Sequence, residues 1–157
     1  MKNMKTKILL SLSLLLLLVS CNSNTIYSEF KNDFDSNRWL KADAKTFEFT
    51  IDEDAQLYDI IFDFSHVYDY QFSSIPINFI IESPNSLQEK FTIDLKIKDN
   101  SGKDIGDCSG DICDLKFKIK EKYKLEKGKY KVIISNNFKA DYLPNVIGVG
   151  LDVEKLK

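Results

Sequence analysis

Apolar and polar residues alternate along most of the chain from residue 25 onwards. The stretch 46–51 reads TFEFTI and the stretch 58–64 reads YDIIFDF, so that every second side chain is aromatic or aliphatic. A period of two is typical of a β-strand with one face in a core and the other in water. The same alternation predicts six further strands, over 25–30, 75–81, 91–97, 115–119, 130–134 and 147–153. Because helical spacing is scarce between them, the pattern predicts about eight antiparallel strands.

Eight half-buried strands separated by turn residues bury their inner faces most simply as two packed sheets. The sequence therefore predicts an all-β fold, an antiparallel β-sandwich of jelly-roll type. A closed barrel uses the same inward and outward alternation, so it remains the alternative. Residues 25–157 are enough for one ordinary domain and hardly for two, and we expect a single sandwich domain over that range.

The first 20 residues have a different pattern. Lys2, Lys5 and Lys7 form a basic segment, and the apolar run 8–19 that follows is too short to span a bilayer. Both features are typical of a signal peptide, which we expect to be residues 1–20.

The signal peptide ends on Leu-Val-Ser-Cys, an order similar to a bacterial lipobox. It predicts acylation of Cys21 and cleavage just before it, whereas a secreted protein with an incidental cysteine is the alternative. Several acyl chains together exceed what stable anchoring to a membrane needs. Residues 21–24 would then be a lipidated N-terminus and short tether. Its three extended residues reach only about 10 Å, which keeps the domain close to the membrane.

Charge and motifs exclude several functions. The formal net charge of −2 becomes more negative once the three lysines of residues 1–20 are removed, so nothing favours nucleic acid as a partner. The sequence contains no nucleophile elbow, P-loop, zincin motif or dinucleotide-binding glycine pattern. The one histidine, His66, follows a strand pattern and is interpreted as structural. We therefore expect no enzyme activity, no cofactor and no small-molecule substrate.

The segment 99–114, DNSGKDIGDCSGDICD, is the longest irregular stretch of the chain. With Cys21 assigned to lipid, Cys108 and Cys113 remain as a pair, and outside the cytoplasm a disulfide is favoured. Thiolate ligation of a metal is the rival interpretation, but it needs two more ligands from distant sequence. Calcium is a further alternative, although the spacing fits no EF-hand loop. Its ligands would be the five aspartates Asp99, Asp104, Asp107, Asp111 and Asp114. We predict the disulfide and no metal.

A sandwich whose inner faces form the core can act only through its outer faces, edges and loops. We therefore predict protein–protein docking through the loop 99–114 and the connection 68–74. The expected contact residues are Tyr68, Tyr70, Phe72, Asp104, Asp107 and Asp111. A weaker candidate is a lysine face on the strand at 115–119, made by Lys116, Lys118, Lys120, Lys122 and Lys124.

A carbohydrate-binding surface is the alternative function. Exposed aromatic rings stack on sugars, and four such residues fall near the predicted strand ends. They are Trp39, Tyr68, Tyr70 and Phe72. An exposed, flat or grooved patch holding these rings would favour sugar binding, whereas buried rings would favour a structural role.

Several runs resemble the gliding-motility lipoprotein family GldH across essentially the whole chain after the signal peptide. They are CNSNTIYSEFK, FEFTI, YDIIFDFSHVYDYQFSSI, GKYKVIIS and LPNVIGVGLDVEK. The shared positions, in order, are Cys21, Tyr27, Trp39, Tyr68, Tyr70, Gly128, Tyr130, Gly148 and Gly150. The cysteine pair at 108 and 113 departs from the family pattern.

The resemblance implies a non-enzymatic lipoprotein needed for surface gliding and associated with the machinery that exports surface proteins. Its partners would be other envelope proteins of that machinery, and its role an assembly or structural one. We expect it on the outer membrane facing the periplasm, because Asn22 to Thr25 carry no acidic cluster of the kind that marks surface export. A carbohydrate-binding envelope lipoprotein remains the alternative.

Overall fold

The computed structural model describes residues 24–157, so the expected signal peptide and the lipidated Cys21 lie outside the described residues. Within residues 24–157 the one helical element is the short 3-10 turn η2 (Asp35–Asn37), and no helix there has the length and apolarity to cross a membrane. The strands are β1 (Thr25–Lys31), β2 (Trp39–Leu40), β3 (Lys45–Ile51), β4 (Gln56–Val67), β5 (Ser74–Glu82), β6 (Gln88–Lys96), β7 (Asp107–Ser109), β8 (Ile112–Leu125), β9 (Gly128–Asn136), β10 (Tyr142–Leu143) and β11 (Val146–Lys155).

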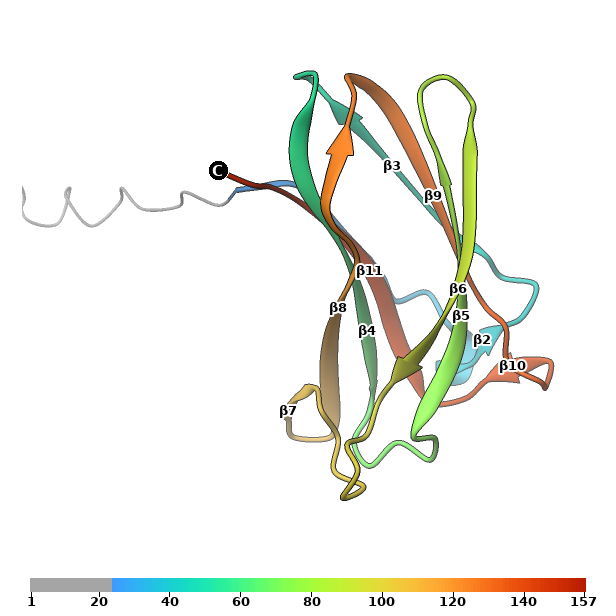
Figure 1. The fold of residues 1–157 in the computed structure, drawn as a ribbon. Coiled ribbons are helices and arrows are strands. Elements are labelled where there is room, and N and C mark those ends of the chain that lie inside the picture. Colours follow the sequence, from blue (N-terminus) through green and yellow to red (C-terminus); the bar gives the residue numbers. More distant parts are fainter. Residues whose placement is uncertain (1–23) are drawn as a thin grey trace, which may run out of the picture.

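Two antiparallel sheets pack face to face (Figure 1). One has the strand order β1-β11-β4-β8-β7 and the other the order β3-β9-β5-β6, while β2 and β10 form a separate pair. If the eight long strands are numbered in chain order, the two sheets read 1-8-3-6 and 2-7-4-5, which is a jelly roll. The predicted sandwich is confirmed, and the barrel alternative is wrong.

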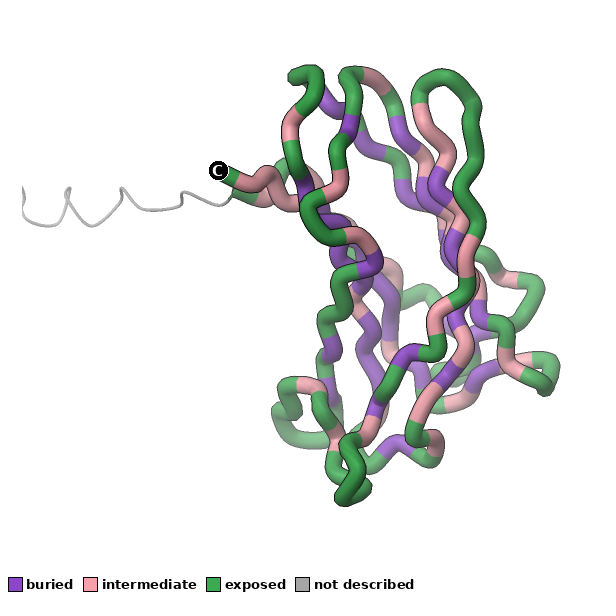
Figure 2. The backbone as a smooth tube through the Cα atoms, viewed as in Figure 1, coloured by how far each residue is buried: buried purple, intermediate pink, exposed green. Residues whose placement is uncertain are grey.

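The core lies between the two sheets, where the buried positions of successive strands meet (Figure 2). β3 and β5 bury every second residue, as the period of two predicts. Phe62 on β4 and Phe79 on β5 join the sheets directly, with ring centroids 5.3 Å apart at an interplanar angle of 81°. All eight predicted strands are present, and the structure adds the short strands β2, β7 and β10.

β4 and β11 are buried at nearly every position, and in β8 the alternation is interrupted by irregular pairing. Its register against β4 shifts twice, so that Lys118 lies opposite Ile61 and Lys120 lies opposite Ile60. Lys120 consequently turns toward the other sheet, where its ammonium group pairs with Glu89 and lies 4.6 Å from the centre of the Phe91 ring. The five lysines therefore do not share one face, and the predicted lysine surface is wrong.

The connections at the two ends of the sandwich differ in length. At one end, called the turn end, the strands are joined by 52–55, 83–87 and 126–127, and Thr25 pairs with Glu154 there. At the other end, called the loop end, the connections are 32–44, 68–73, 97–106 and 137–145. β4 has 12 residues and runs from one end to the other, a length of about 36 Å at roughly 3.3 Å per residue. The first described residues thus lie far from the long loops.

Candidate functional site

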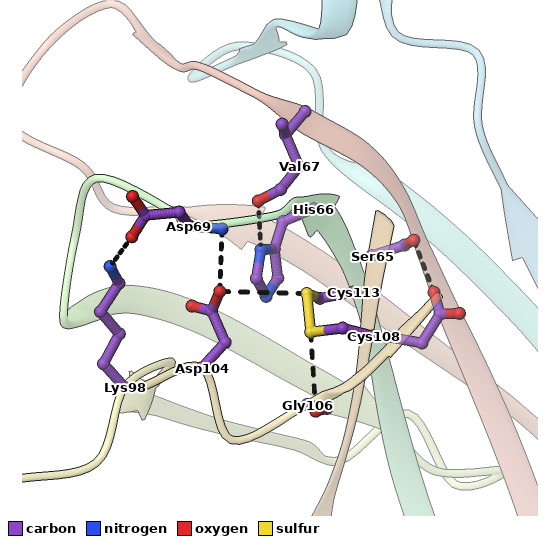
Figure 3. The surroundings of a disulfide bond; sticks show 10 residues. Ser65, His66, Val67, Asp69, Lys98, Asp104, Gly106, Cys108 and Cys113 are labelled. Carbon is purple, nitrogen blue, oxygen red and sulfur yellow. Dashed lines mark hydrogen bonds and ion pairs between the residues drawn. A yellow bond between two sulfur atoms is a disulfide. The ribbon is translucent and has the colours of Figure 1, made fainter. Parts of the chain in front are cut away.

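The two segments predicted to dock a partner lie side by side at the loop end. The backbone N–H of Tyr68 donates to the carbonyl of Asp111 at 2.9 Å, and the N–H of Asp69 donates to Asp104 Oδ2 at 2.8 Å. Lys98 then pairs with Asp69 at 2.6 Å (Figure 3). These contacts tie the connection after β4 to the loop before β7 and to the turn between β7 and β8, so the structure brings the two segments together.

One of the predicted contact residues belongs to the core, and a second packs against it. Tyr70 is 1% exposed, and its hydroxyl donates to the carbonyl of Pro144 at 2.8 Å. Burial also raises the pKa of this hydroxyl, which stays protonated. Phe72 is half-buried and packs on Phe138, with ring centroids 4.8 Å apart. Tyr70 offers no surface to a partner, and its assignment to docking is wrong.

Asp104 makes a contact within the protein. One oxygen of its carboxylate accepts the N–H of Asp69, and the other oxygen is buried. Tyr68 is 58% exposed, and Asp107 and Asp111, which lie on the hairpin of β7 and β8, are exposed as well. The structure adds two exposed apolar residues that the sequence reasoning missed, Ile105 and Ile112. The sequence feature that could have identified them is that each is an isolated apolar residue in an otherwise polar segment.

The aromatic platform proposed for sugar binding is not formed. Trp39 is fully buried, and its indole N–H donates to the carbonyl of Asp43 at 2.7 Å. Its ring packs near Phe34, with centroids 5.7 Å apart. Of the four rings, Tyr68 alone is exposed, so these residues support the fold.

Cys108 and Cys113 face each other across a hairpin formed by β7 and β8. The structure joins them by a disulfide with a Cα–Cα distance of 4.0 Å, inside the limit of about 7 Å for such a bond. The turn is only two residues long, and Gly110 at its first position has a φ of 61°, which a tight hairpin turn needs. The segment 99–114 is therefore irregular only in part, contrary to expectation. Cys108 is exposed, whereas Cys113 is buried.

His66 lies directly opposite Cys113 in the register of β4 and β8. It is fully buried between aromatic rings, with centroids 5.5 Å from Phe64 and 4.9 Å from Tyr70. Nδ1 is 2.9 Å from the carbonyl of Val67, so Nδ1 carries the hydrogen and donates it. Nε2 is buried and has no hydrogen-bond partner.

The five aspartates proposed for calcium do not converge. Asp99 accepts the N–H groups of Ser101 and Lys103 and so closes its own turn. Asp114 accepts the hydroxyl of Ser65 at 2.6 Å. In residues 24–157, the one group of side chains able to hold a metal is Asp104, Cys108 and Cys113, whose ligand atoms lie within 4.8 Å of one another.

The outer face of the five-stranded sheet carries an exposed ring. Phe30 is 49% exposed and lies over Gly148 and Gly150 on the neighbouring strand β11. A β-carbon at either glycine would overlap that ring. The two glycines, which belong to the shared family positions, therefore make room for Phe30 on the outer face.

Two acids and one lysine meet next to Phe30. Lys116 lies 2.6 Å from Asp152 and 3.5 Å from Asp63. Burial, followed by the charge of Asp152, raises the pKa of Asp63 to about 6. Burial alone would raise the pKa of Asp152 as well, but hydrogen bonds from Lys116 and Ser28 outweigh it and lower that pKa. Asp63 is thus the acid of this face that takes up a proton under mildly acidic conditions.

Comparison with solved structures finds carbohydrate-binding modules. A family 35 module from an environmental isolate is 10% identical, covers 87% of this chain and 94% of its own, and has a TM-score of 0.38. A module specific for non-crystalline cellulose is 14% identical, with 83% and 73% coverage and a TM-score of 0.38. These values are too low to carry an argument about function. No curated protein matches the chain.

The family comparison is different in kind, because it covers nearly all of the sandwich. The model of the GldH lipoprotein family matches residues 25–153, which run from the first residue of β1 to within two residues of the end of β11. The chain therefore belongs to the GldH lipoprotein family.

Proposed function

We propose that this GldH-family lipoprotein is a non-enzymatic assembly component of the gliding-motility machinery and the secretion system associated with it. It is anchored in the outer membrane through lipid on Cys21, faces the periplasm, and docks another envelope protein with its loop end. The observation that carries this proposal is the set of exposed side chains gathered there on a rigid frame. They are Tyr68, Ile105, Asp107, Asp111 and Ile112.

The composition of that surface suits a protein partner. Tyr68, Ile105 and Ile112 offer apolar area, and an aromatic side chain is among the residue types enriched at interfaces. Asp107 and Asp111 add exposed negative charge next to them. A partner with an apolar centre and basic residues around it would match this surface, and the charges would steer its approach.

The frame beneath the surface is held from inside. The hydrogen bonds of Tyr68 and Asp69 fix the two segments relative to each other, and the disulfide closes the hairpin. Docking on a preorganised surface avoids the entropy cost of ordering loops, which raises affinity without further contacts.

The position of the loop end sets where docking takes place. Thr25 lies at the turn end, and β4 separates the two ends by about 36 Å. With only residues 22–24 between Cys21 and β1, the sandwich would present its long loops about one domain length from the lipid.

The docking surface is tested by charge reversal. The double variant Asp107→Lys/Asp111→Lys should lose most co-purification of envelope partners from solubilised outer membrane, because neither side chain has an internal bond to break. The matched control, Asp52→Lys/Glu126→Lys, makes the same change in charge at the turn end and should co-purify partners as the wild type does. Equal co-purification by both variants would place the docking surface elsewhere.

The apolar part of the surface is tested separately by Tyr68→Ala/Ile112→Ala. This variant should weaken co-purification while its unfolding free energy stays within about 1 kcal/mol of the wild type, because Tyr68 is 58% and Ile112 is 41% exposed. Wild-type recovery of partners would show that these residues are not part of the interface.

Anchoring is tested with Cys21→Ala. The variant should leave the membrane fraction, because it lacks the cysteine that carries the proposed lipid. Protease added to intact cells should leave the wild-type protein uncut. Retention of the variant in membranes would contradict lipid anchoring, and digestion in intact cells would contradict the periplasmic orientation.

A further inference from the structure

The disulfide at the loop end lies near two buried polar atoms that make no hydrogen bond in the oxidised protein. Asp104 Oδ1 and His66 Nε2 are both buried, and neither has a hydrogen-bond partner. An unsatisfied buried polar atom costs about 1–3 kcal/mol, so native proteins keep few of them. Two such atoms within one small region suggest a second state in which the Asp104 carboxylate and the His66 ring bind a ligand.

The fold brings four metal-binding side chains to this place from four segments (Figure 3). His66 is on β4, Asp104 precedes β7, Cys108 is on β7 and Cys113 is on β8. Asp104 Oδ2 is 3.9 Å from Cys113 Sγ. His66 and Cys113 are directly paired in register and both buried, so their side chains are neighbours on one face, with Cβ atoms about 4.5–5.5 Å apart.

We propose that reduction of the Cys108–Cys113 disulfide converts this place into a zinc site. Its ligands are the thiolates of Cys108 and Cys113, the carboxylate of Asp104 and Nε2 of His66. Two sulfurs with one imidazole and one carboxylate form the four-coordinate donor set that Zn²⁺ accepts. The two ligands that a thiolate site lacks in the sequence around the cysteines are thus supplied by the loop before β7 and by β4.

The histidine is already prepared for this role. A zinc-bound imidazole usually donates its other ring N–H to a carbonyl or carboxylate, which fixes the tautomer. The Nδ1–H of His66 donates to the carbonyl of Val67 at 2.9 Å, which leaves Nε2 unprotonated with its lone pair free. Burial keeps water away from that lone pair.

For Asp104, Cys108 and Cys113, whose ligand atoms lie within 4.8 Å of one another, the distances require only a small rearrangement, whereas the His66 ring must move closer to them. Zn–S bonds of about 2.3 Å and Zn–O bonds of about 2.1 Å place tetrahedral sulfur and oxygen ligands roughly 3.6 Å apart, and two sulfurs roughly 3.8 Å apart. The gap between Asp104 Oδ2 and Cys113 Sγ is 3.9 Å, close to the first value. The Cα atoms of the cysteines are 4.0 Å apart, so the sulfurs can separate by rotation of their side chains.

The redox step needs a dithiol reductant, either a protein with two thiols or a small dithiol. One of its thiolates attacks Sγ of Cys108, which is the exposed sulfur, and Cys113 leaves as a thiolate. The second thiol of the reductant then attacks the mixed disulfide and releases Cys108. The reductant becomes a disulfide, its two electrons and two protons give two cysteine thiols, and Zn²⁺ displaces those two protons when it binds.

The test uses the detergent-solubilised lipoprotein with Co²⁺ as a spectroscopic substitute for Zn²⁺. After reduction by a phosphine and removal of oxygen, the protein should bind one Co²⁺ with the absorption of tetrahedral cobalt and a sulfur-to-cobalt charge-transfer band. The oxidised protein should bind none. Asp104→Asn and His66→Gln should each weaken Zn²⁺ binding at least about tenfold, measured in competition with a chelator.

Asp107→Asn is the matched control, because Asp107 adjoins Cys108 but is exposed and outside the ligand set. It should bind zinc as the wild type does. The proposal is overturned if the reduced wild type shows no tetrahedral thiolate spectrum, or if Asp104→Asn and His66→Gln bind as tightly as the control. Should a variant fail to fold, X-ray absorption of the zinc-loaded wild type decides: two sulfur and two nitrogen or oxygen ligands support the site, and any other count contradicts it.

Discussion

The turn end and the loop end of the sandwich join the same eight long strands in different ways. At the turn end the connections are two to five residues long, and Asp54 of one accepts the N–H of Lys127 of another at 2.8 Å. At the loop end, Trp39 and Tyr70 are buried beneath connections of six residues or more. A short turn leaves no residues from which to build a surface. A long connection provides such residues, but buried side chains must then hold it in place.

The strongest test of that difference is to remove one support. Trp39→Ala should lower the free energy of unfolding by about 3–5 kcal/mol, because it empties a fully buried site and leaves the carbonyl of Asp43 without its donor. Leu87→Ala, in the turn after β5, should change it by less than about 0.5 kcal/mol, since Leu87 is 68% exposed. Urea unfolding measures both. Similar losses for the two variants would remove the contrast between the ends.

On the outer face between the two ends, we expect the contribution of Asp63 to the free energy of unfolding to depend on pH. The pKa of Asp63 lies above its ordinary value, so the folded protein holds this proton more tightly than the unfolded chain. The resulting stabilisation is complete below about pH 4 and is lost as the pH rises through about 6. Relative to wild type, Asp63→Asn should therefore gain up to about 3 kcal/mol between pH 4 and pH 8.

Urea unfolding of wild type and Asp63→Asn at a series of pH values measures this gain. The groups that face Asp63 are Asp152 on β11 and Lys116 on β8, so the difference reports on that cluster and not on either end. The control is Asp52→Asn in an exposed turn. A difference between Asp63→Asn and wild type that does not change with pH would contradict the raised pKa.

The smallest of these effects concerns the hairpin at the loop end. Replacing both cysteines, Cys108→Ser/Cys113→Ser, should lower the free energy of unfolding by about 2 kcal/mol, because the disulfide closes only a small ring. The measurement is urea unfolding with a chelator present, so that no metal contributes. A loss below about 0.5 kcal/mol would mean that the contacts of Asp69 and Tyr68 hold this end without the disulfide.

The period of two in the sequence predicted the eight long strands because one face of each strand lies against a single core. It could not predict β2 and β10, which are two residues long and exist only because Trp39 and Leu143 are buried beneath the loop end. The register shift in β8 was equally invisible, since Lys120 reads as an outward position until its partner Ile60 is known. Such features depend on contacts between distant segments.

The candidate site was predicted in part for a similar reason. Sequence reasoning found the two segments that meet at the loop end, because long connections with polar residues are recognisable. It did not separate Tyr68 from Tyr70, since two tyrosines two residues apart look alike until burial distinguishes them. It also interpreted His66 as structural without seeing that the register places Cys113 opposite it.

The pairing of β1 with β11 has a mechanical consequence. β1 starts at Thr25 and runs toward the loop end, with its hydrogen bonds to β11 nearly perpendicular to its length. If the protein is lipidated and docks a partner as proposed, a pull between the lipid and the partner would act along β1 and shear those bonds together, rather than break them one after another. The hydrogen bonds between edge strand β1 and β11 would then resist such a load together. The force needed to break them would set the largest tension that the anchored protein could transmit.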